Sequence, residues 1–336
     1  MIITRTPYRV SLFGGGSDFP EWYANRIGKV ISFTINKYCY ISARELPPFF
    51  EHNYRVSYSK VETAKKLDEI EHPAFREIIR KYGNQQRFEI HHHGDLPAKS
   101  GVGSSSAFAV GLINAMSQFQ KNEFTQIQIA KAAIEMEQEV LNEKVGSQDQ
   151  IACSLGGVNE ITFGKGNKWK NQKLDLKIST LNKIEDHSVL IFSGIQRISS
   201  KISESLLTNL SKSHKYIERN IELVDECVKI LTSGGDIQTI GNLLKENWTL
   251  KKLSNPMASN SFIDDFFAKA LKSGALGGKI LGAGGGGFSL FWVKPENRAR
   301  FLKEFSLGVE VPFRIDNQGT TCVLNSDLAF RSVGNV

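Results

Sequence analysis

The sequence predicts an α/β fold in two domains, residues 1–185 and 186–336. Strand-like runs alternate with helix-like runs in the first segment, whereas the second is mostly helix-like, and we interpret this shift as a domain boundary. Glycine-rich loops lie beside predicted strands, where the absence of side chains lets a ligand or another backbone approach closely. These observations are typical of an α/β protein that binds a ligand at its loops.

Hydrophobic periodicity and turn residues assign the individual elements. Strands are expected at residues 2–13, 29–43, 54–58, 87–93, 158–163, 188–192 and 288–293. Helices are expected at residues 20–25, 65–82 (interrupted near His72-Pro73), 108–119, 127–142, 201–231, 237–253 and 261–273. A polar, charged loop is expected at 164–183, residues 153–155 are too short a region to assign, and a helix with one or two strands is expected at 301–324.

Composition limits the classes of protein that need to be considered. With 40% hydrophobic and 23% charged residues, the 336-residue chain is typical of a soluble globular protein. No run approaches the roughly 20 apolar residues of a membrane span, and no signal peptide is visible, so we expect a cytoplasmic protein without a membrane partner. The four cysteines are scattered, as reduced core thiols are. The net charge of +7 fits anionic ligands, but no dense Lys/Arg run with interleaved aromatics predicts nucleic-acid binding.

The segment 96–107, LPAKSGVGSSSA, lies between a predicted strand and a predicted helix. A helix start leaves backbone N–H groups unpaired and carries partial positive charge, so this arrangement suits an anion. Gly101 and Gly103 let the backbone approach a ligand, and the serines that follow offer hydroxyls to phosphate or Mg²⁺. Because Lys99 precedes the glycines, the loop is not a Walker A motif. A flexible loop capped by serine remains the alternative.

A second glycine cluster, Gly14–Gly16, ends the first predicted strand and leads to Asp18. Asp18 has two interpretations. Its carboxylate either caps the short helix that follows or accepts hydrogen bonds from sugar hydroxyls, and from this segment alone the cap is favoured.

Acidic residues gather at the end of the predicted helix 127–142 and in the turn after it: Glu135, Glu137, Glu139, Glu143 and Asp149. Acids at a helix C-terminus oppose the helix dipole, so they are either solvated surface or a cation site. Glu137 and Asp149 are separated by a helix end and a turn, which allows both to converge on one place.

Three further segments carry polar or glycine-rich patterns. His91-His92-His93 cannot bind one metal ion together, because consecutive strand residues point to opposite faces. Arg197, with Ser199 and Ser200, lies at a predicted helix start that suits an anion. The glycine-rich segment 277–287 is expected to form a loop that another backbone or a ligand approaches closely.

Taken together, the segments Arg9–Asp18, Pro97–Ala107 and Gly277–Gly287 resemble, in this order, the three glycine-rich motifs of the GHMP small-molecule kinase family. The resemblance covers essentially the whole chain. It implies a two-domain fold with the active site in the cleft between an N-terminal mixed α/β domain and a C-terminal ferredoxin-like α+β domain. Four segments are most similar to the heptose-phosphate kinase branch, and fucose kinases share parts of the first and last: Arg5–Asp18, His72-Pro73, Gly194–Arg197 and Gly282–Phe288.

The resemblance also implies roles for individual residues. Asp149 would be the catalytic base, and Arg9 would lie near the reacting hydroxyl and favour the ionised form of that carboxylate. ATP phosphates would bind the loop formed by Pro97, Lys99, Ser100, Gly101, Val102, Gly103, Ser104, Ser105 and Ser106. Mg²⁺ would be held by Glu137 with Ser104 or Ser105. The sugar would contact Asp18, Gly15, Gly16, Ser17, Gly284 and Gly285, with Arg197 on its 7-phosphate.

The implied activity is ATP-dependent phosphorylation of the anomeric hydroxyl of a heptose 7-phosphate, toward a GDP-activated heptose. The galactokinase branch carries Glu-His where this chain has Gly15-Gly16, which argues against galactose. The alternatives are a kinase for an unphosphorylated sugar such as fucose, a sensor that binds sugar and nucleotide without turnover, and a decarboxylase of a phosphorylated acid. The oligomeric state is open, and a homodimer is one option.

Overall fold

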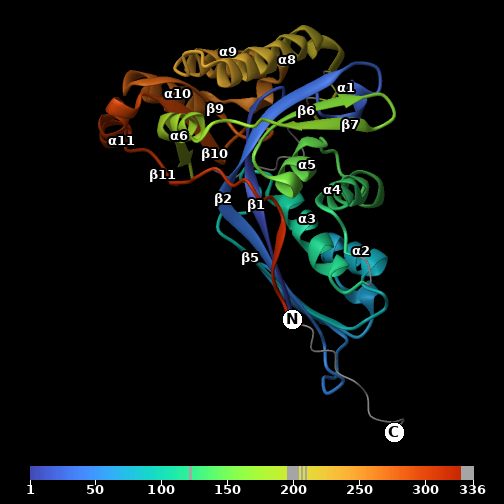
Figure 1. Ribbon diagram of the computed structural model, residues 1–336. Coiled ribbons are helices and arrows are strands. Elements are labelled where there is room, and N and C mark those ends of the chain that lie inside the picture. The colour runs from blue at the N-terminus through green and yellow to red at the C-terminus, as the bar shows by residue number, and fades with distance from the viewer. Residues whose placement is uncertain (121–122, 195–203, 206, 209, 327–336) are drawn as a thin grey trace.

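The computed structural model describes residues 1–120, 123–194, 204–205, 207–208 and 210–326, which form two β-sheets with helices packed against each (Figure 1). The larger sheet has the strand order β12-β1-β2-β5-β3-β4, and β6 pairs with β2 and with β7. The smaller sheet has the order β11-β8-β10-β9. The strands of the larger sheet are β1 (Ile2–Phe13), β2 (Gly28–Glu45), β3 (Tyr54–Ser57), β4 (Val61–Ala64), β5 (Phe88–Gly94), β6 (Val158–Gly164), β7 (Lys168–Lys173) and β12 (Thr321–Asn325). Those of the smaller sheet are β8 (Ser188–Phe192), β9 (Ala275–Ile280), β10 (Phe288–Val293) and β11 (Val309–Glu310).

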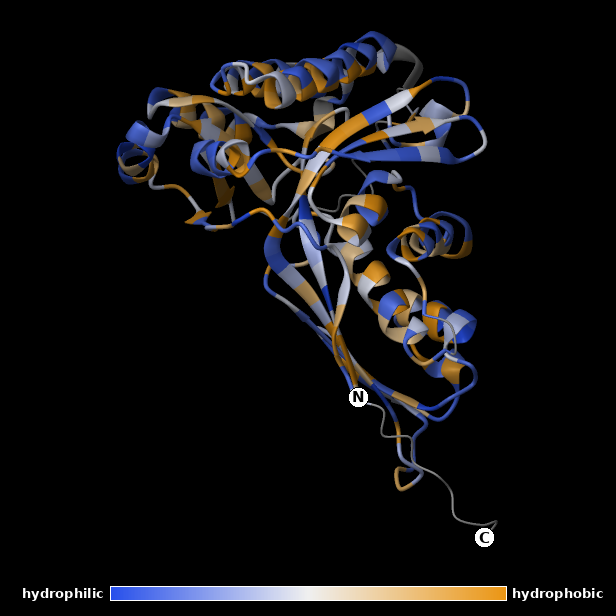
Figure 2. Ribbon diagram, in the orientation of Figure 1, coloured by the Kyte–Doolittle hydropathy of each residue, from blue (hydrophilic) through white to orange (hydrophobic). Residues whose placement is uncertain are grey.

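Two groups of helices cover these sheets. The first group lies along one face of the larger sheet: α2 (Pro73–Tyr82), α3 (Ser104–Ser117), α4 (Gln126–Glu135) and α5 (Gln148–Leu155) (Figure 1). The second lies with the smaller sheet: α6 (Ile178–His187), α8 (Leu210–Ser233), α9 (Thr239–Ser254), α10 (Ser261–Lys272) and α11 (Arg298–Phe305). The short elements are α1 (Pro20–Tyr23), a π-helix (Met136–Val140) and the 3₁₀ turns Leu67–Glu69, Pro256–Ala258 and Pro295–Asn297. Blue and orange segments alternate along α8 and α9 in Figure 2, as expected for helices with one buried face.

Helix α3 lies at the centre of the larger half. From Ser106 to Ser117 every residue is buried, so this helix is enclosed rather than amphipathic. It begins after Gly103, whose left-handed backbone (φ 74°) is strained for a residue with a side chain. The position of α3 is therefore fixed by the burial of its side chains, and its start is fixed by the glycine that precedes it.

The strand β1 connects the core to the functional residues. It pairs with β2 in antiparallel register, with Tyr8 opposite Ile35 and Arg9 opposite Thr34. Val10 and Leu12 of β1 are fully buried. The smaller half has its own aromatic core, which includes Phe266, Phe291 and Phe305.

Several parts of the chain differ from the sequence-based expectations, and the expected loop 277–287 begins within β9. The expected loop 164–183 contains β7 and most of α6, and was missed because β7 is a polar edge strand paired only with β6. Residues 153–155 belong to α5, an eight-residue helix between glycine-containing turns. In the expected helix 65–82 only α2 is α-helical, and it begins at Pro73, which favours the first turn of a helix.

The last described strand returns to the larger sheet. β12 pairs antiparallel with β1, with Ile2 opposite Asn325 and Arg5 opposite Thr321. A domain boundary near residue 185 stays a prediction. β12 follows this boundary in the sequence but pairs with β1, which precedes it. Among the described residues, no helix is long and apolar enough to cross a membrane.

Candidate active site

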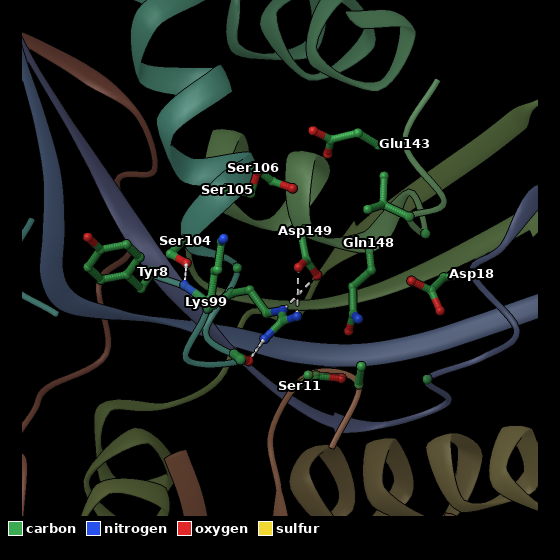
Figure 3. A pocket seen from close by; sticks show the side chains of 18 of the residues that line it. Tyr8, Ser11, Asp18, Lys99, Ser104, Ser105, Ser106, Glu143, Gln148 and Asp149 are labelled. Carbon is green, nitrogen blue, oxygen red and sulfur yellow. Dashed lines mark hydrogen bonds and ion pairs between the residues drawn. The ribbon is translucent and has the colours of Figure 1, made fainter. Parts of the chain in front are cut away.

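A cavity of about 790 Å³ opens between the two halves of the molecule. One wall comes from β1, the glycine- and serine-rich segment 96–107 (the Gly/Ser loop) and the starts of α3 and α5. The other wall comes from α8, α9 and β9. Figure 3 shows side chains that line it, among them Ser104, Asp149 and Asp18, which come from three separate segments. The loops predicted to bind a ligand therefore share one cavity.

Arg9 and Asp149 form the central ion pair of this cavity. The Arg9 Nε donates to Asp149 Oδ1 and its Nη2 donates to Oδ2, both at 2.7 Å. The third guanidinium nitrogen, Nη1, donates to the carbonyl of Gly101 at 2.6 Å. Such a two-point contact fixes the orientation of the carboxylate as well as its position. β1, the Gly/Ser loop and α5 are thereby tied together at one point.

The Gly/Ser loop turns at Lys99, Gly101 and Gly103, which all have positive φ. The Lys99 N–H donates to Ser104 Oγ at 3.1 Å, and Ser100 Oγ donates to the Pro97 carbonyl. Lys99, Gly101 and Gly103 to Ser106 line the cavity, whereas Val102 is buried and Pro97 and Ser100 support the loop from outside it. The loop presents the unpaired N–H groups of α3 to the cavity.

The third glycine cluster packs directly on this loop. A Cβ at Gly282 would lie 2.6 Å from the Gly101 Cα, and one at Gly287 would lie 2.3 Å from the Ser100 carbonyl oxygen. The expectation that another backbone approaches this cluster closely is confirmed. Gly284 and Gly285, proposed to contact the sugar, instead pack on Ala258, and the Gly285 N–H donates to its carbonyl at 2.9 Å.

Glu137 lies buried behind the loop, in the π-helix that follows α4. Its Oε2 accepts hydrogen bonds from Ser106 Oγ at 2.7 Å and from Gln150 Nε2. Its Oε1 is buried and has no hydrogen-bond partner among the described residues. Burial, together with the charges of Glu143 and Asp149, raises the pKa of this carboxyl to about 7. The serine that hydrogen-bonds to Glu137 is Ser106, and the expectation that Ser104 or Ser105 holds Mg²⁺ with Glu137 stays a prediction.

Asp18 does not cap the following helix, so that interpretation of the sequence is wrong. The residue at the N-cap of α1 is Phe19, and Asp18 Oδ1 instead accepts the Gly16 N–H at 2.9 Å. Asp18 is 5% exposed and lines the cavity. Burial and the charge of Asp149 raise its pKa to about 6. Ser17 is fully buried and donates to the Gly14 carbonyl, so it supports the turn from behind.

Two lysines that the sequence did not single out also line the cavity. The Lys251 Nζ, on α9, donates to the carbonyls of Ile280 and Gly282 at 3.1 and 2.6 Å. The Lys279 Nζ, on β9, donates to the Leu12 carbonyl at 2.8 Å, and this side chain is 5% exposed. Lys251 is followed by a second lysine in an amphipathic helix, and Lys279 follows two glycines. Surface lysines occur in the same sequence patterns, so the sequence does not distinguish these two.

One end of the cavity has an aromatic wall. Tyr58, His72, His92 and Phe108 line it, and the His72 ring packs against both Tyr58 and Phe108. Burial lowers the pKa of His92 to about 4, which favours a neutral ring. His91 and His93 stack together on the other face of β5, so the three histidines alternate as expected for a strand. Arg197 lies outside the described residues.

Known proteins resemble this chain along most of its length. Residues 65–157 match the model of the GHMP kinases N terminal domain, and residues 221–305 match that of the GHMP kinases C terminal domain. The chain is 30% identical over 314 residues to a D-glycero-alpha-D-manno-heptose 7-phosphate kinase of Campylobacter jejuni, covering 90% of this chain and 92% of that protein. The chain belongs to the GHMP kinase family.

Other GHMP kinases share less sequence but the same fold. The crystal structure of a D-glycero-D-manno-heptose 1-phosphate kinase from Bacteriodes thetaiotaomicron superposes with a TM-score of 0.80 at 22% identity, covering 97% of this chain and all of that one. The chain is also 24% identical over 324 residues to a bifunctional fucokinase/GDP-fucose pyrophosphorylase of Arabidopsis thaliana, covering 89% of this chain and 30% of that protein. The protein thus has the two-domain, mixed α/β fold of a GHMP kinase.

Proposed function

We propose that the protein is an ATP-dependent sugar kinase that phosphorylates the anomeric C1 hydroxyl of D-glycero-D-manno-heptose 7-phosphate to give the 1,7-bisphosphate. The observation that carries this proposal is the Arg9–Asp149 ion pair in the same cavity as the start of α3. The heptose 7-phosphate kinase of Campylobacter jejuni, similar along nearly its whole length, supports the choice of substrate.

The Gly/Ser loop is suited to the ATP phosphates. Phosphoryl transfer requires positioning and charge neutralisation more than covalent chemistry. Backbone N–H groups at the start of α3, with Lys99 and the hydroxyls of Ser104 and Ser105, supply both on this wall of the cavity. The aromatic wall of Tyr58 and His72 is the part of the cavity suited to the nucleobase.

The residues around Glu137 fit a magnesium ion. Mg²⁺ prefers carboxylate, hydroxyl and water oxygens, and the buried Glu137 Oε1 has no hydrogen-bond partner among the described residues. Glu137, with the Ser106 hydroxyl beside it and Ser104 or Ser105 toward the cavity, would hold the ion. When bound, Mg²⁺ neutralises charge on the phosphates.

Asp149 would orient the sugar hydroxyl and accept its proton. As the bond between the hydroxyl oxygen and the γ-phosphorus forms, the bond from phosphorus to the β-γ bridging oxygen breaks and ADP leaves. An anomeric hydroxyl is more acidic than an ordinary alcohol, so a carboxylate held by Arg9 suffices as base. Asp18, which lines the cavity on the turn after β1, would accept hydrogen bonds from other sugar hydroxyls.

The experiment that tests this function is a coupled assay of ADP release against a panel of sugars. The panel contains heptose 7-phosphate, the unphosphorylated heptose, fucose, galactose and mevalonate. We expect the highest kcat/KM for heptose 7-phosphate, with ³¹P NMR showing a new anomeric phosphate. A higher kcat/KM for fucose would support the alternative kinase, and nucleotide and sugar binding without ADP release would support the sensor.

A further inference from the structure

Lys251 and Lys279 are ammonium groups without a carboxylate partner in the wall of the cavity. No ion pair among the described residues includes either lysine, whereas Lys252, the next residue on α9, pairs with Asp264 at 2.9 Å. The hydrogen-bond partners of both are backbone carbonyls, two for Lys251 and one for Lys279. A protonated lysine has three N–H donors. Lys251 therefore has at least one N–H available to a ligand, and Lys279 has at least two.

Enclosing two cations without counter-charge is unfavourable. Burial and the charge of Arg9 lower the pKa of Lys251 to about 7. Burial, followed by the charges of Lys251 and Arg9, lowers the pKa of Lys279 well below its usual range, with Asp18 opposing this. When both lysines are protonated, Arg9, Lys251 and Lys279 carry three positive charges, against the two negative charges of Asp149 and Asp18. A bound anion would relieve this imbalance.

The position of the lysines favours an anion on the sugar over the phosphates of ATP. Lys279 is bonded to Leu12, two residues before the Gly14–Gly16 turn that leads to Asp18. The Lys251 Nζ, bonded to the Gly282 carbonyl, is near enough to Lys279 for its charge to act on that group. The phosphates of ATP already have the backbone N–H groups at the start of α3 and the Glu137 site. A neutral sugar would leave both ammonium groups uncompensated.

We propose that Lys251, together with Lys279, forms an anion subsite that binds a phosphate monoester carried by the sugar substrate. This inference rests on the proposed function, because it names the group that distinguishes a sugar phosphate from a plain sugar. It assigns to α9 and β9 the role that the sequence had assigned to Arg197.

The first test is steady-state kinetics of Lys251→Met, which keeps the length of the side chain and removes its charge. We expect KM for heptose 7-phosphate to rise about 10- to 100-fold, as for loss of a hydrogen bond to a charged group, with KM for ATP changed less than about threefold. The KM for the unphosphorylated heptose should also change less than about threefold. Lys251→Arg should restore part of the affinity, and Lys252→Met is the matched control without effect on either sugar.

A different pattern would overturn the subsite. If Lys251→Met lowers kcat for both sugars alike, or raises KM for ATP as much as KM for the sugar phosphate, the lysine acts on the phosphates of ATP.

The second test is independent of the identity of the sugar. Inorganic phosphate is titrated calorimetrically into wild type and Lys251→Met, each saturated with Mg²⁺ and a non-hydrolysable ATP analogue. We expect phosphate to bind wild type at least about tenfold more tightly. Equal binding, or none to either protein, overturns the inference. If wild type phosphorylates no sugar phosphate, the proposed function fails, while a difference in this titration still supports the subsite.

Discussion

The guanidinium of Arg9 binds the carboxylate of Asp149 through two parallel hydrogen bonds of 2.7 Å each. Arg9 is 4% exposed and the Asp149 side chain is 23% exposed, so the pair is partly shielded from solvent and is screened by salt less than an exposed pair. Because Arg9 also holds the Gly101 carbonyl, the position of the proposed base is linked to the position of the loop proposed to bind the nucleotide. The two substrates would therefore be aligned by one side chain.

Replacing Asp149 with asparagine tests its role as base. The substituted amide would keep the volume of the side chain and one acceptor oxygen but could not accept the proton. We expect kcat to fall about 10²- to 10⁴-fold, with the dissociation constant of ATP unchanged. Rapid-quench kinetics and ATP titration measure the two quantities. Near-native turnover with intact ATP binding would remove Asp149 from this role.

Glu137→Gln tests the proposed magnesium site. Loss of the buried negative charge should raise the Mg²⁺ concentration for half-maximal activity about tenfold or more. Glu139→Gln is the matched control, because Glu139 is an exposed acid in the same π-helix. An unchanged magnesium requirement in both variants would contradict the assignment.

Asp18→Asn tests how much the buried charge of Asp18 lowers the free energy of unfolding. The folded-state pKa of Asp18, about 6, lies above the unfolded value, so the folded state binds the extra proton. Wild-type stability is therefore lost as pH rises from about 4 to about 6, by an amount on the order of 3 kcal/mol. Urea denaturation should show Asp18→Asn to be the more stable protein at pH 7, with the difference disappearing near pH 4. A difference in unfolding free energy that does not vary with pH would exclude this explanation.

Gly282→Ala tests the contact between two glycine-rich loops. A methyl group there meets the Gly101 Cα at 2.6 Å, on a backbone with φ +65°. Gly166→Ala is the control, since its φ is +77° and nothing lies within 4 Å. Both variants should lose about 1–2 kcal/mol from backbone strain, but only Gly282→Ala should also raise KM for ATP. Equal KM values in the two variants would show that the loops are independent.

Long periodic segments and glycine positions could be predicted from the sequence. The strands β1, β2, β6, β8 and β10 were predicted close to their bounds, because each alternates or runs apolar next to a turn. β7 could not be predicted, since it is a polar edge strand in which Trp169 is the one large apolar residue, so it carries no hydrophobic pattern. The same applies to α5, whose eight residues lie between glycines.

Only the residues of the candidate site that belong to sequence motifs could be predicted. Arg9, Asp18, Asp149 and the Gly/Ser loop were named from the sequence, and the structure brings them to one cavity. The contact of Glu137 with Ser106, and the burial of Lys251 and Lys279, depend on how distant segments pack. No local pattern in a single sequence records such packing, so these features required the structure.

The pairing of β12 with β1 has a consequence for how the cavity can open. The chain passes from the larger sheet to the smaller one before β8 and returns after β11, so two covalent connections, rather than one, join the two halves. A double tether opposes twisting of the halves about each other and leaves a bending motion as the easier route for substrate entry. A fragment ending near residue 185 would also leave β1 with an unpaired edge, a feature that promotes self-association.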